Sequence, residues 1–144
     1  MQKLQQAAHD LGLPLGERTK TYNSRLAQEL AKWAESLGKG ELFHEAVFRA
    51  YFVEGINIGK ADQLARLAGL LGLPENQALD VLATRSFQEA VDADWLRSRT
   101  LGITAVPTFL VSSKKLVGAQ PYEVLEQFLL TAGAHKLGTS GTAN

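Results

Sequence analysis

The sequence predicts an α/β protein that is mostly helical and carries one small β-hairpin near its C-terminus. Apolar residues recur at the spacing of amphipathic helices over most of the 144 residues. One stretch, Ile103–Val111, is instead rich in β-branched residues, which favour strands. Because two strands alone are marginally stable in water, we expect the sheet of this fold to be incomplete.

Six helices are expected before that stretch. Glycines end most of the apolar stripes: Gly12 closes the first, Gly38 the second and Gly72 the fourth. Pro74 suits the first turn of the fifth helix, because the N–H that proline lacks would have no partner there. The expected helices span residues 4–11, 22–37, 41–51, 64–71, 74–82 and 86–101. The larger aromatic side chains expected in their core are Trp33, Tyr51, Phe52 and Trp95.

The C-terminal part is expected to form a hairpin and one further helix. The run Phe109–Val111 is apolar on both faces, which is typical of a strand covered from two sides. Ser112–Lys115 is expected to turn the chain, Leu116–Gly118 to pair with the first strand, and Pro121–Leu129 to form the helix. The predicted organisation is a helical domain (1–101), a hairpin-and-helix segment (102–133) and a flexible tail (134–144).

Composition excludes several classes of function. The 15 basic and 15 acidic residues cancel, so no nucleic acid partner is expected. No apolar run approaches the roughly 20 residues of a membrane helix, and the N-terminus has no apolar core like that of a secretory signal, so a cytoplasmic location without membrane contact is expected. The chain has no cysteine, which excludes disulfides and thiolate nucleophiles within it. His9, His44 and His135 are far apart in the sequence, so no metal site is expected. No other cofactor is expected either.

Five short segments resemble one known family, in that family's order along the chain. Gly102–Phe109 resembles the cis-proline segment of DsbA-like thioredoxin-fold proteins. Four segments resemble the FrnE-like branch of this family, a branch of dithiol–disulfide oxidoreductases and isomerases: Asn23–Arg25, Phe48–Phe52, Asn57–Ile58 and Gly118–Tyr122. The resemblance extends over nearly the whole chain.

The resemblance implies a helical insertion domain followed by the C-terminal hairpin and helix of a thioredoxin-like fold. In that family a strand, a helix with a Cys-x-x-Cys motif and a second strand come first. We therefore expect this sequence to begin after that unit, as a truncated form without the central strands and the dithiol. The implied function is the C-terminal part of a disulfide oxidoreductase or isomerase acting on proteins. We expect it to be redox-inactive alone, because thiol–disulfide exchange requires an attacking thiolate.

The resemblance also implies a substrate-binding loop. In thioredoxin-like proteins the residue before the cis-proline offers its backbone N–H and C=O to an extended substrate. That residue is Val106 here, with Pro107 after it and Thr104 nearby. The β-branched side chain of Val106 favours the extended conformation required before a proline. The alternative is a trans proline with only a structural role at the entrance of a strand.

Three polar residues in the resembling segments are secondary candidates for binding. Asn23 and Asn57 have a structural alternative, since asparagine is common at helix starts. Gln120 has one as well, as a cap of the helix that begins at Pro121. No catalytic residue and no metal ligand is assigned in this chain.

Two other functions stay open. The chain could be a non-redox module that forms a homo-oligomer, or that binds a protein or the missing N-terminal segment in trans, because unpaired strand edges recruit other chains. It could also be a glutathione-dependent transferase or isomerase. Relatives of that kind carry a polar residue and an aspartate where this chain has Ala119-Gln120, so the missing carboxylate counts against this function.

Overall fold

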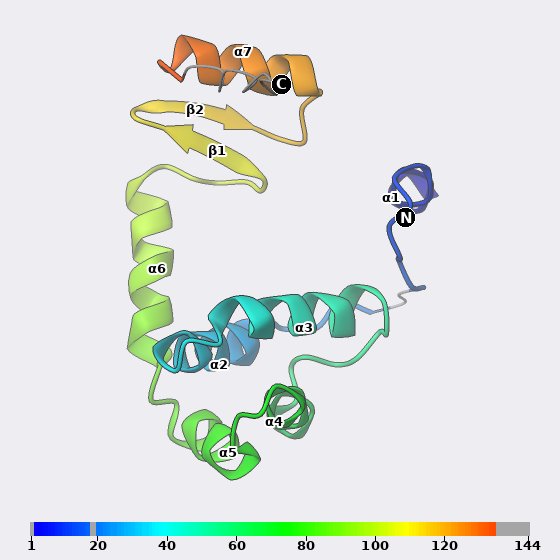
Figure 1. Cartoon of the computed structure of the whole chain (residues 1–144). Coiled ribbons are helices and arrows are strands. Elements are labelled where there is room, and N and C mark those ends of the chain that lie inside the picture. Colours follow the sequence, from blue (N-terminus) through cyan, green and yellow to red (C-terminus); the bar gives the residue numbers. More distant parts are fainter. Residues whose placement is uncertain (1, 18–19, 135–144) are drawn as a thin grey trace, which may run out of the picture. The chain divides into compact units, whose positions relative to one another are not determined.

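The computed structural model describes residues 2–17 and 20–134, and confirms a mostly helical chain with one small antiparallel sheet (Figure 1). The elements, in chain order, are α1 (Gln2–Asp10), α2 (Arg25–Ser36), α3 (Gly40–Phe52), α4 (Ala61–Leu70), α5 (Glu75–Thr84), α6 (Gln88–Thr100), β1 (Thr108–Val111), β2 (Lys114–Val117) and α7 (Tyr122–Thr131). The chain divides into two compact units, Met1–Trp95 and Leu96–Asn144, with the division inside α6. The domain limits inferred from the sequence stay predictions, and residues 135–144 of the predicted tail lie outside the described residues.

In the helical unit, α2 packs against α3, α4 and α5. The amphipathic stripe of α2 supplies one side of the core with Ala27, Leu30, Ala31 and Ala34, at the spacing of one helix face. The helix ends at Ser36, Gly38 just after it has a positive φ of 70°, and the N–H of Lys39 donates to Ala34 O at 2.8 Å. This geometry satisfies a carbonyl that would otherwise be unpaired at the end of the helix.

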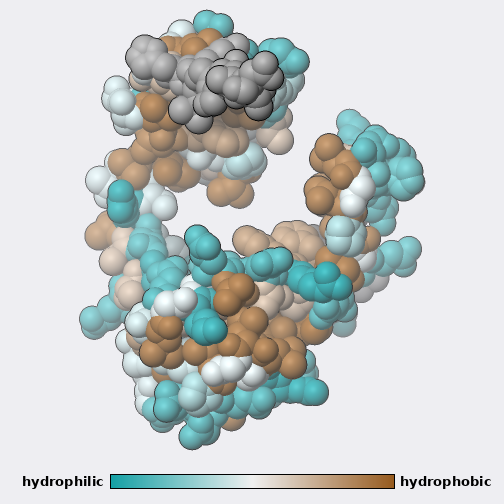
Figure 2. Space-filling model, in the orientation of Figure 1, coloured by the Kyte–Doolittle hydropathy of each residue, from teal (hydrophilic) through white to brown (hydrophobic). Residues whose placement is uncertain are grey.

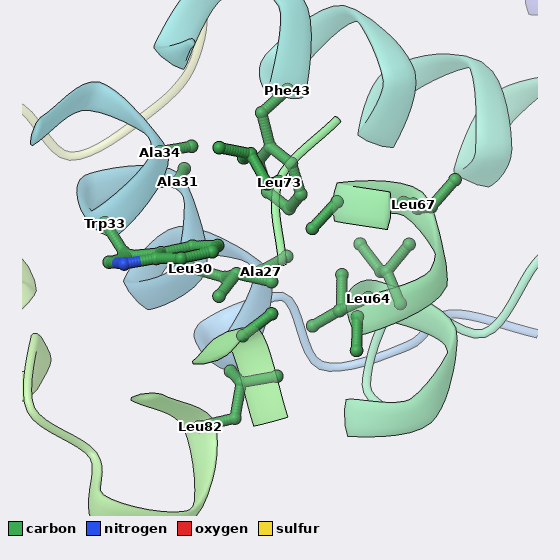
Figure 3. Close-up of a cluster of buried hydrophobic side chains, with 14 of the residues drawn as sticks. Ala27, Leu30, Ala31, Trp33, Ala34, Phe43, Leu64, Leu67, Leu73 and Leu82 are labelled. Carbon is green, nitrogen blue, oxygen red and sulfur yellow. The ribbon is translucent and has the colours of Figure 1, made fainter. Parts of the chain in front are cut away.

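The core of this unit lies between α2, α3, α4 and α5. Phe43 from α3, Leu30 from α2 and Leu64 from α4 have no exposed surface, and Figure 3 shows these side chains within the same cluster. Trp33 is 6% exposed, so its predicted place in the core is confirmed. Trp95 is 44% exposed, so its predicted place in the core is wrong.

The second unit contains the hairpin and α7. β1 and β2 are antiparallel, with Phe109 opposite Leu116 and Val111 opposite Lys114. The connection consists of Ser112 and Ser113 alone, and Ser112 has a φ of 55°, which two-residue hairpin loops require. The predicted four-residue turn is therefore wrong, because Lys114 and Lys115 belong to β2.

This second unit has little interior of its own. None of the described residues from Leu96 to Ala134 falls in the buried class. Phe109 is 39% and Leu110 36% exposed, although both lie in the strand predicted to be covered from two sides. A two-stranded sheet with so little burial gains little free energy from folding by itself.

Candidate functional site

The loop between α6 and β1 contains the three residues predicted to bind substrate. It follows Thr100, the last residue of α6; Gly102 has a positive φ of 64°, and its N–H donates to Arg99 O at 2.8 Å. The Val106–Pro107 peptide bond is cis. At the other end, Pro107 O accepts a hydrogen bond from the N–H of Gly118 at 2.8 Å, which joins the loop to the end of β2.

Two side chains brace this loop. The hydroxyl of Thr108 donates to Ala105 O at 2.6 Å. The ammonium of Lys115 lies 2.8 Å from Leu101 O and 3.3 Å from Gly102 O, and so connects β2 to the end of α6. A cation at the last carbonyls of a helix is favourable because those carbonyls carry partial negative charge. The loop is thus held at both ends by the strands that follow it.

Between these anchors, the peptide groups of Val106 are free. Val106 is 88% exposed, and neither its N–H nor its C=O makes a hydrogen bond to another described residue. Thr104 is exposed in the same loop. The chain therefore presents one unpaired backbone donor and one unpaired acceptor next to the start of β1, which is the arrangement that an extended peptide can pair with.

The two edges of the hairpin differ in charge. Hydrogen-bonded pairs alternate along an antiparallel ladder, and the bond from Gly118 to Pro107 O sets this alternation. The peptide groups of Thr108 and Leu110 consequently point away from β2, toward the free edge of β1. That strand carries no charged side chain, whereas β2 carries Lys114 and Lys115. Lysines on an edge strand oppose further pairing, so β1 offers the open edge and β2 the protected one.

Two of the secondary candidates lie in the helical unit and stabilise turns there. The carboxamide oxygen of Asn23 accepts from the N–H of Arg25 at 2.8 Å, and that of Asn57 accepts from the N–H of Gly59 at 2.9 Å. The two turns meet at Gly59, where an added Cβ would lie 3.1 Å from Asn57 Oδ1 and 3.3 Å from Asn23 O. The structure therefore brings Asn23 and Asn57 together, each engaged in a local turn.

Gln120 also has a local partner. Its side-chain N–H donates to Val117 O at 2.9 Å, at the end of β2. The N-cap position of α7 is Pro121, and no side chain caps this helix. The interpretation of Gln120 as a helix cap is therefore wrong, because its amide turns back to the strand instead.

A pocket of about 460 Å³ in the helical unit was not predicted from the sequence. Its lining comes from the segment before α2, from α2 and α3, and from Ile58, and consists of Thr21, Tyr22, Ser24, Ala27, Gln28, Ala31, His44, Val47, Phe48, Tyr51, Phe52 and Ile58. Tyr51 and Phe52, predicted to fill the core, are only partly buried and line this pocket. A signal was present in the sequence, since three of the resembling segments, Asn23–Arg25, Phe48–Phe52 and Asn57–Ile58, contribute to this lining.

A charged cluster joins α2 to the end of α5 and the start of α6. Glu29 is 1% exposed, and its carboxylate accepts from Arg25 Nε at 2.6 Å and from Arg85 Nε and Nη2 at 2.7 and 2.6 Å. Arg25 also pairs with Asp92 at 2.7 Å, and its guanidinium lies 4.7 Å from the centroid of the Trp95 ring. The hydrogen bonds from Arg85, and then those from Arg25, lower the pKa of Glu29 below its ordinary value although burial acts in the opposite direction.

Residues 2–17 and 20–134 contain no group of three or more potential metal ligands, and His135 lies outside the described residues. In the same part of the chain, no helix has the length and apolar character needed to cross a membrane.

Comparisons with known proteins agree with the fold and with the resemblance to DsbA-like thioredoxin-fold proteins. The uncharacterized protein YwbO of Bacillus subtilis (strain 168) is 36% identical over 104 residues, which are 71% of this chain and 52% of YwbO. The chain thus spans about half the length of this curated relative. A crystal structure of a “putative protein disulfide isomerase” from Nitrosomonas europaea matches with a TM-score of 0.68 and 20% identity, over 90% of this chain and 70% of that one. At this identity the structural match establishes the fold alone.

The family model described as the DSBA-like thioredoxin domain matches residues 1–130. This match confirms the family that the cis-proline segment indicated, whereas the FrnE-like branch stays a prediction. By this match over most of its length, the chain belongs to the DSBA-like thioredoxin domain family.

Proposed function

We propose that this chain is the substrate-facing part of a thiol–disulfide oxidoreductase or isomerase of the FrnE-like branch, which acts on proteins. The observation that carries the proposal is the exposed, unpaired peptide of Val106 before the cis Pro107, beside the open edge of β1. An extended polypeptide can add to such groups through main-chain hydrogen bonds, which depend little on its sequence. Thr104 lies in the same loop and completes the proposed binding surface.

The exchange chemistry itself requires a thiolate, and these 144 residues contain no cysteine. We therefore expect the chain to reduce insulin disulfides no faster than a blank that contains only the thiol reductant. The result to measure is the onset of insulin turbidity over a range of chain concentrations. A rate that increases with chain concentration would contradict the expected lack of redox activity.

Substrate binding can be tested separately from redox chemistry. A photoreactive benzoyl-phenylalanine at Val106 should cross-link to a permanently reduced, unfolded protein, because the substrate pairs beside this residue. The matched control carries the same group at Leu70, which is 83% exposed on α4 and lies in the other unit, against 88% for Val106. Equal cross-linking yields at the two positions would contradict the proposed binding loop.

The open edge of β1 favours a second function, a module that assembles through strand pairing. The partner would be a second copy of the chain or a segment that supplies the missing strands in trans. In the first case, light scattering at micromolar concentration should show a dimer or larger oligomer, because the unpaired edge and the exposed apolar side chains around it become covered on association.

A charge on the pairing edge should abolish this association. Leu110→Lys places an ammonium in β1, where strand addition would remove it from water, so this variant should be monomeric. Val117→Lys is the matched control, because β2 already carries two lysines and its edge is not the one used. A wild-type chain that is monomeric, or two variants with the same oligomeric state, would count against assembly through β1.

A further inference from the structure

The two lysines of β2 each reach the C-terminal end of a different helix. The ammonium of Lys115 lies 2.8 Å from Leu101 O and 3.3 Å from Gly102 O, which directly follow α6. The ammonium of Lys114 lies 2.5 Å from the carbonyl oxygen of Thr131, the last residue of α7. Because neighbouring residues of a strand point to opposite faces of the sheet, either contact can be removed without removing the other.

The position of the Lys115 ammonium depends on the absence of a side chain at Gly102. A Cβ built on Gly102 would lie 2.9 Å from Lys115 Nζ, which is closer than real Cβ contacts. Gly102 also has a positive φ of 64°, a backbone conformation that glycine adopts without strain. The glycine after α6 therefore allows both the turn out of the helix and the contact with the lysine.

The loop that contains Val106 is attached to β2 at both ends. Lys115 binds the end at Gly102, and the N–H of Gly118 donates to Pro107 O at the other end, at 2.8 Å. The exposed peptide groups of Val106 lie between these two attachments. Loss of the lysine contact would free the start of the loop from β2, and the peptide groups of Val106 would then adopt more than one orientation.

The unit that contains this loop has few apolar contacts that could order it in another way. None of the described residues from Leu96 to Ala134 is in the buried class, and Figure 2 shows apolar surface, in brown, on this unit. Leu110 of β1 and Leu130 of α7, for example, are 36% and 40% exposed. Without a buried core, a cation at the end of a helix is a larger part of what orders the loop.

We propose that Lys115 is a positioning residue of the substrate loop. Its ammonium, bound to Leu101 O and Gly102 O, keeps the peptide groups of Val106 in the orientation that pairs with an extended polypeptide. This inference rests on the proposed function, because it names what holds the same binding loop in place. A loop that is ordered in only a fraction of the molecules binds with an affinity reduced by that fraction. Loss of the ammonium therefore weakens substrate binding although no group that pairs with the substrate is removed.

Lys115→Met tests the proposal in the full 144-residue chain, because methionine keeps an unbranched side chain and removes its charge. The probe is reduced, carboxymethylated α-lactalbumin, a permanently unfolded protein, and the readout is its cross-link to benzoyl-phenylalanine at Val106. The probe concentration that gives half-maximal cross-linking should rise by about 2- to 5-fold, the effect of one cation at a helix end. The maximal yield should stay that of the wild-type chain.

Two further variants serve as controls. Lys115→Arg keeps the positive charge and the N–H donors, so its half-maximal concentration should be that of the wild type. Lys114→Met is the matched control, because it removes the same charge from the same strand together with a contact to a helix end. It should also bind the probe as the wild type does.

A spectroscopic measurement separates positioning of the loop from general stability of the hairpin. The carbonyl carbon resonances of Leu101 and Gly102 should shift in Lys115→Met and stay in place in Lys114→Met, since only the first variant loses the hydrogen bonds to these two oxygens. The amide of Val106 should become more mobile in nitrogen relaxation in the same variant. Cross-strand nuclear Overhauser contacts of the hairpin should persist in both variants.

Four results would overturn the proposal while the wild-type cross-link at Val106 stands. They are an unchanged half-maximal concentration in Lys115→Met, an equal rise in Lys114→Met, an equal rise in Lys115→Arg, and loss of the cross-strand contacts in Lys115→Met. The last result would assign the lysine to the stability of the hairpin. A wild-type chain that cross-links no better at Val106 than at Leu70 would instead contradict the proposed function, and with it this inference.

Discussion

Replacing Glu29 with Ala should lower the free energy of unfolding by about 3 kcal/mol, the cost of breaking a buried ion pair by removal of one partner. The carboxylate is 1% exposed and accepts from both Arg25 and Arg85, so its removal leaves two guanidinium groups together without the negative charge between them. Urea unfolding followed by circular dichroism measures this loss. Glu35→Ala is the matched control on the same helix, where surface pairs with Lys32 and His44 should be worth about 1 kcal/mol or less.

The pH dependence of this effect has a definite sign. The pKa of Glu29 is lowered in the folded chain from its ordinary value of 4.5. The unfolded chain therefore binds the proton more tightly, and stability from this carboxylate is present above pH 4.5 and is lost as the pH falls below that value through the folded pKa. The difference in stability between the wild type and Glu29→Ala should accordingly shrink in acid. A difference that grows as the pH falls would contradict the role of the two arginines.

Phe43→Ala should destabilise the helical unit by about 3–5 kcal/mol, the usual cost of truncating a fully buried phenylalanine. Its ring has no exposed surface and lies in the cluster formed by α2, α3 and α4, so truncation leaves a cavity that its neighbours cannot fill completely (Figure 3). The loss is a large part of the total stability of a typical domain, about 5–15 kcal/mol.

Thermal and urea unfolding measure the effect of Phe43→Ala. Leu42→Ala removes the adjacent side chain of α3, which is 48% exposed, and should cost about 1 kcal/mol or less. If the two variants unfold at the same urea concentration, the packing of Phe43 does not determine the stability of this unit.

The helices were predictable from this sequence because apolar residues on one helix face recur at the helical period of 3.6 residues. The stripe of α2, with Leu30 and Trp33 inward, is such a case. Its start was less clear, since the helix begins at Arg25 instead of residue 22 and the carboxamide of Asn23 forms a turn before it. The hairpin loop was misplaced for a related reason: Lys114 resembles a turn residue, and strand pairing overrides that local preference.

Features that depend on distant residues could not be read from local patterns. Arg85 reaches Glu29 across 56 positions, and Trp95 reaches Gln28 across 67. Neither contact leaves a periodic signal, so Trp95 was predicted to be buried although its ring faces a guanidinium at the surface. The cis-proline loop was predictable from the resemblance of one contiguous segment to a known family. The pocket was not, because its lining comes from separate segments of the chain.

No described residue of the hairpin unit is buried. The stability of the folded hairpin should therefore depend on a polypeptide that binds to it and covers its apolar side chains. By mass action, a polypeptide that binds only the ordered hairpin stabilises it, and the stabilisation increases with the logarithm of the polypeptide's concentration once this exceeds the dissociation constant. The backbone amides of Thr108 and Leu110, which face the open edge, should respond to such binding. Their exchange with deuterium should be fast in the isolated chain and should slow when a strand pairs with β1. The exchange rate of these two amides therefore measures how much of the chain has a strand bound at this edge.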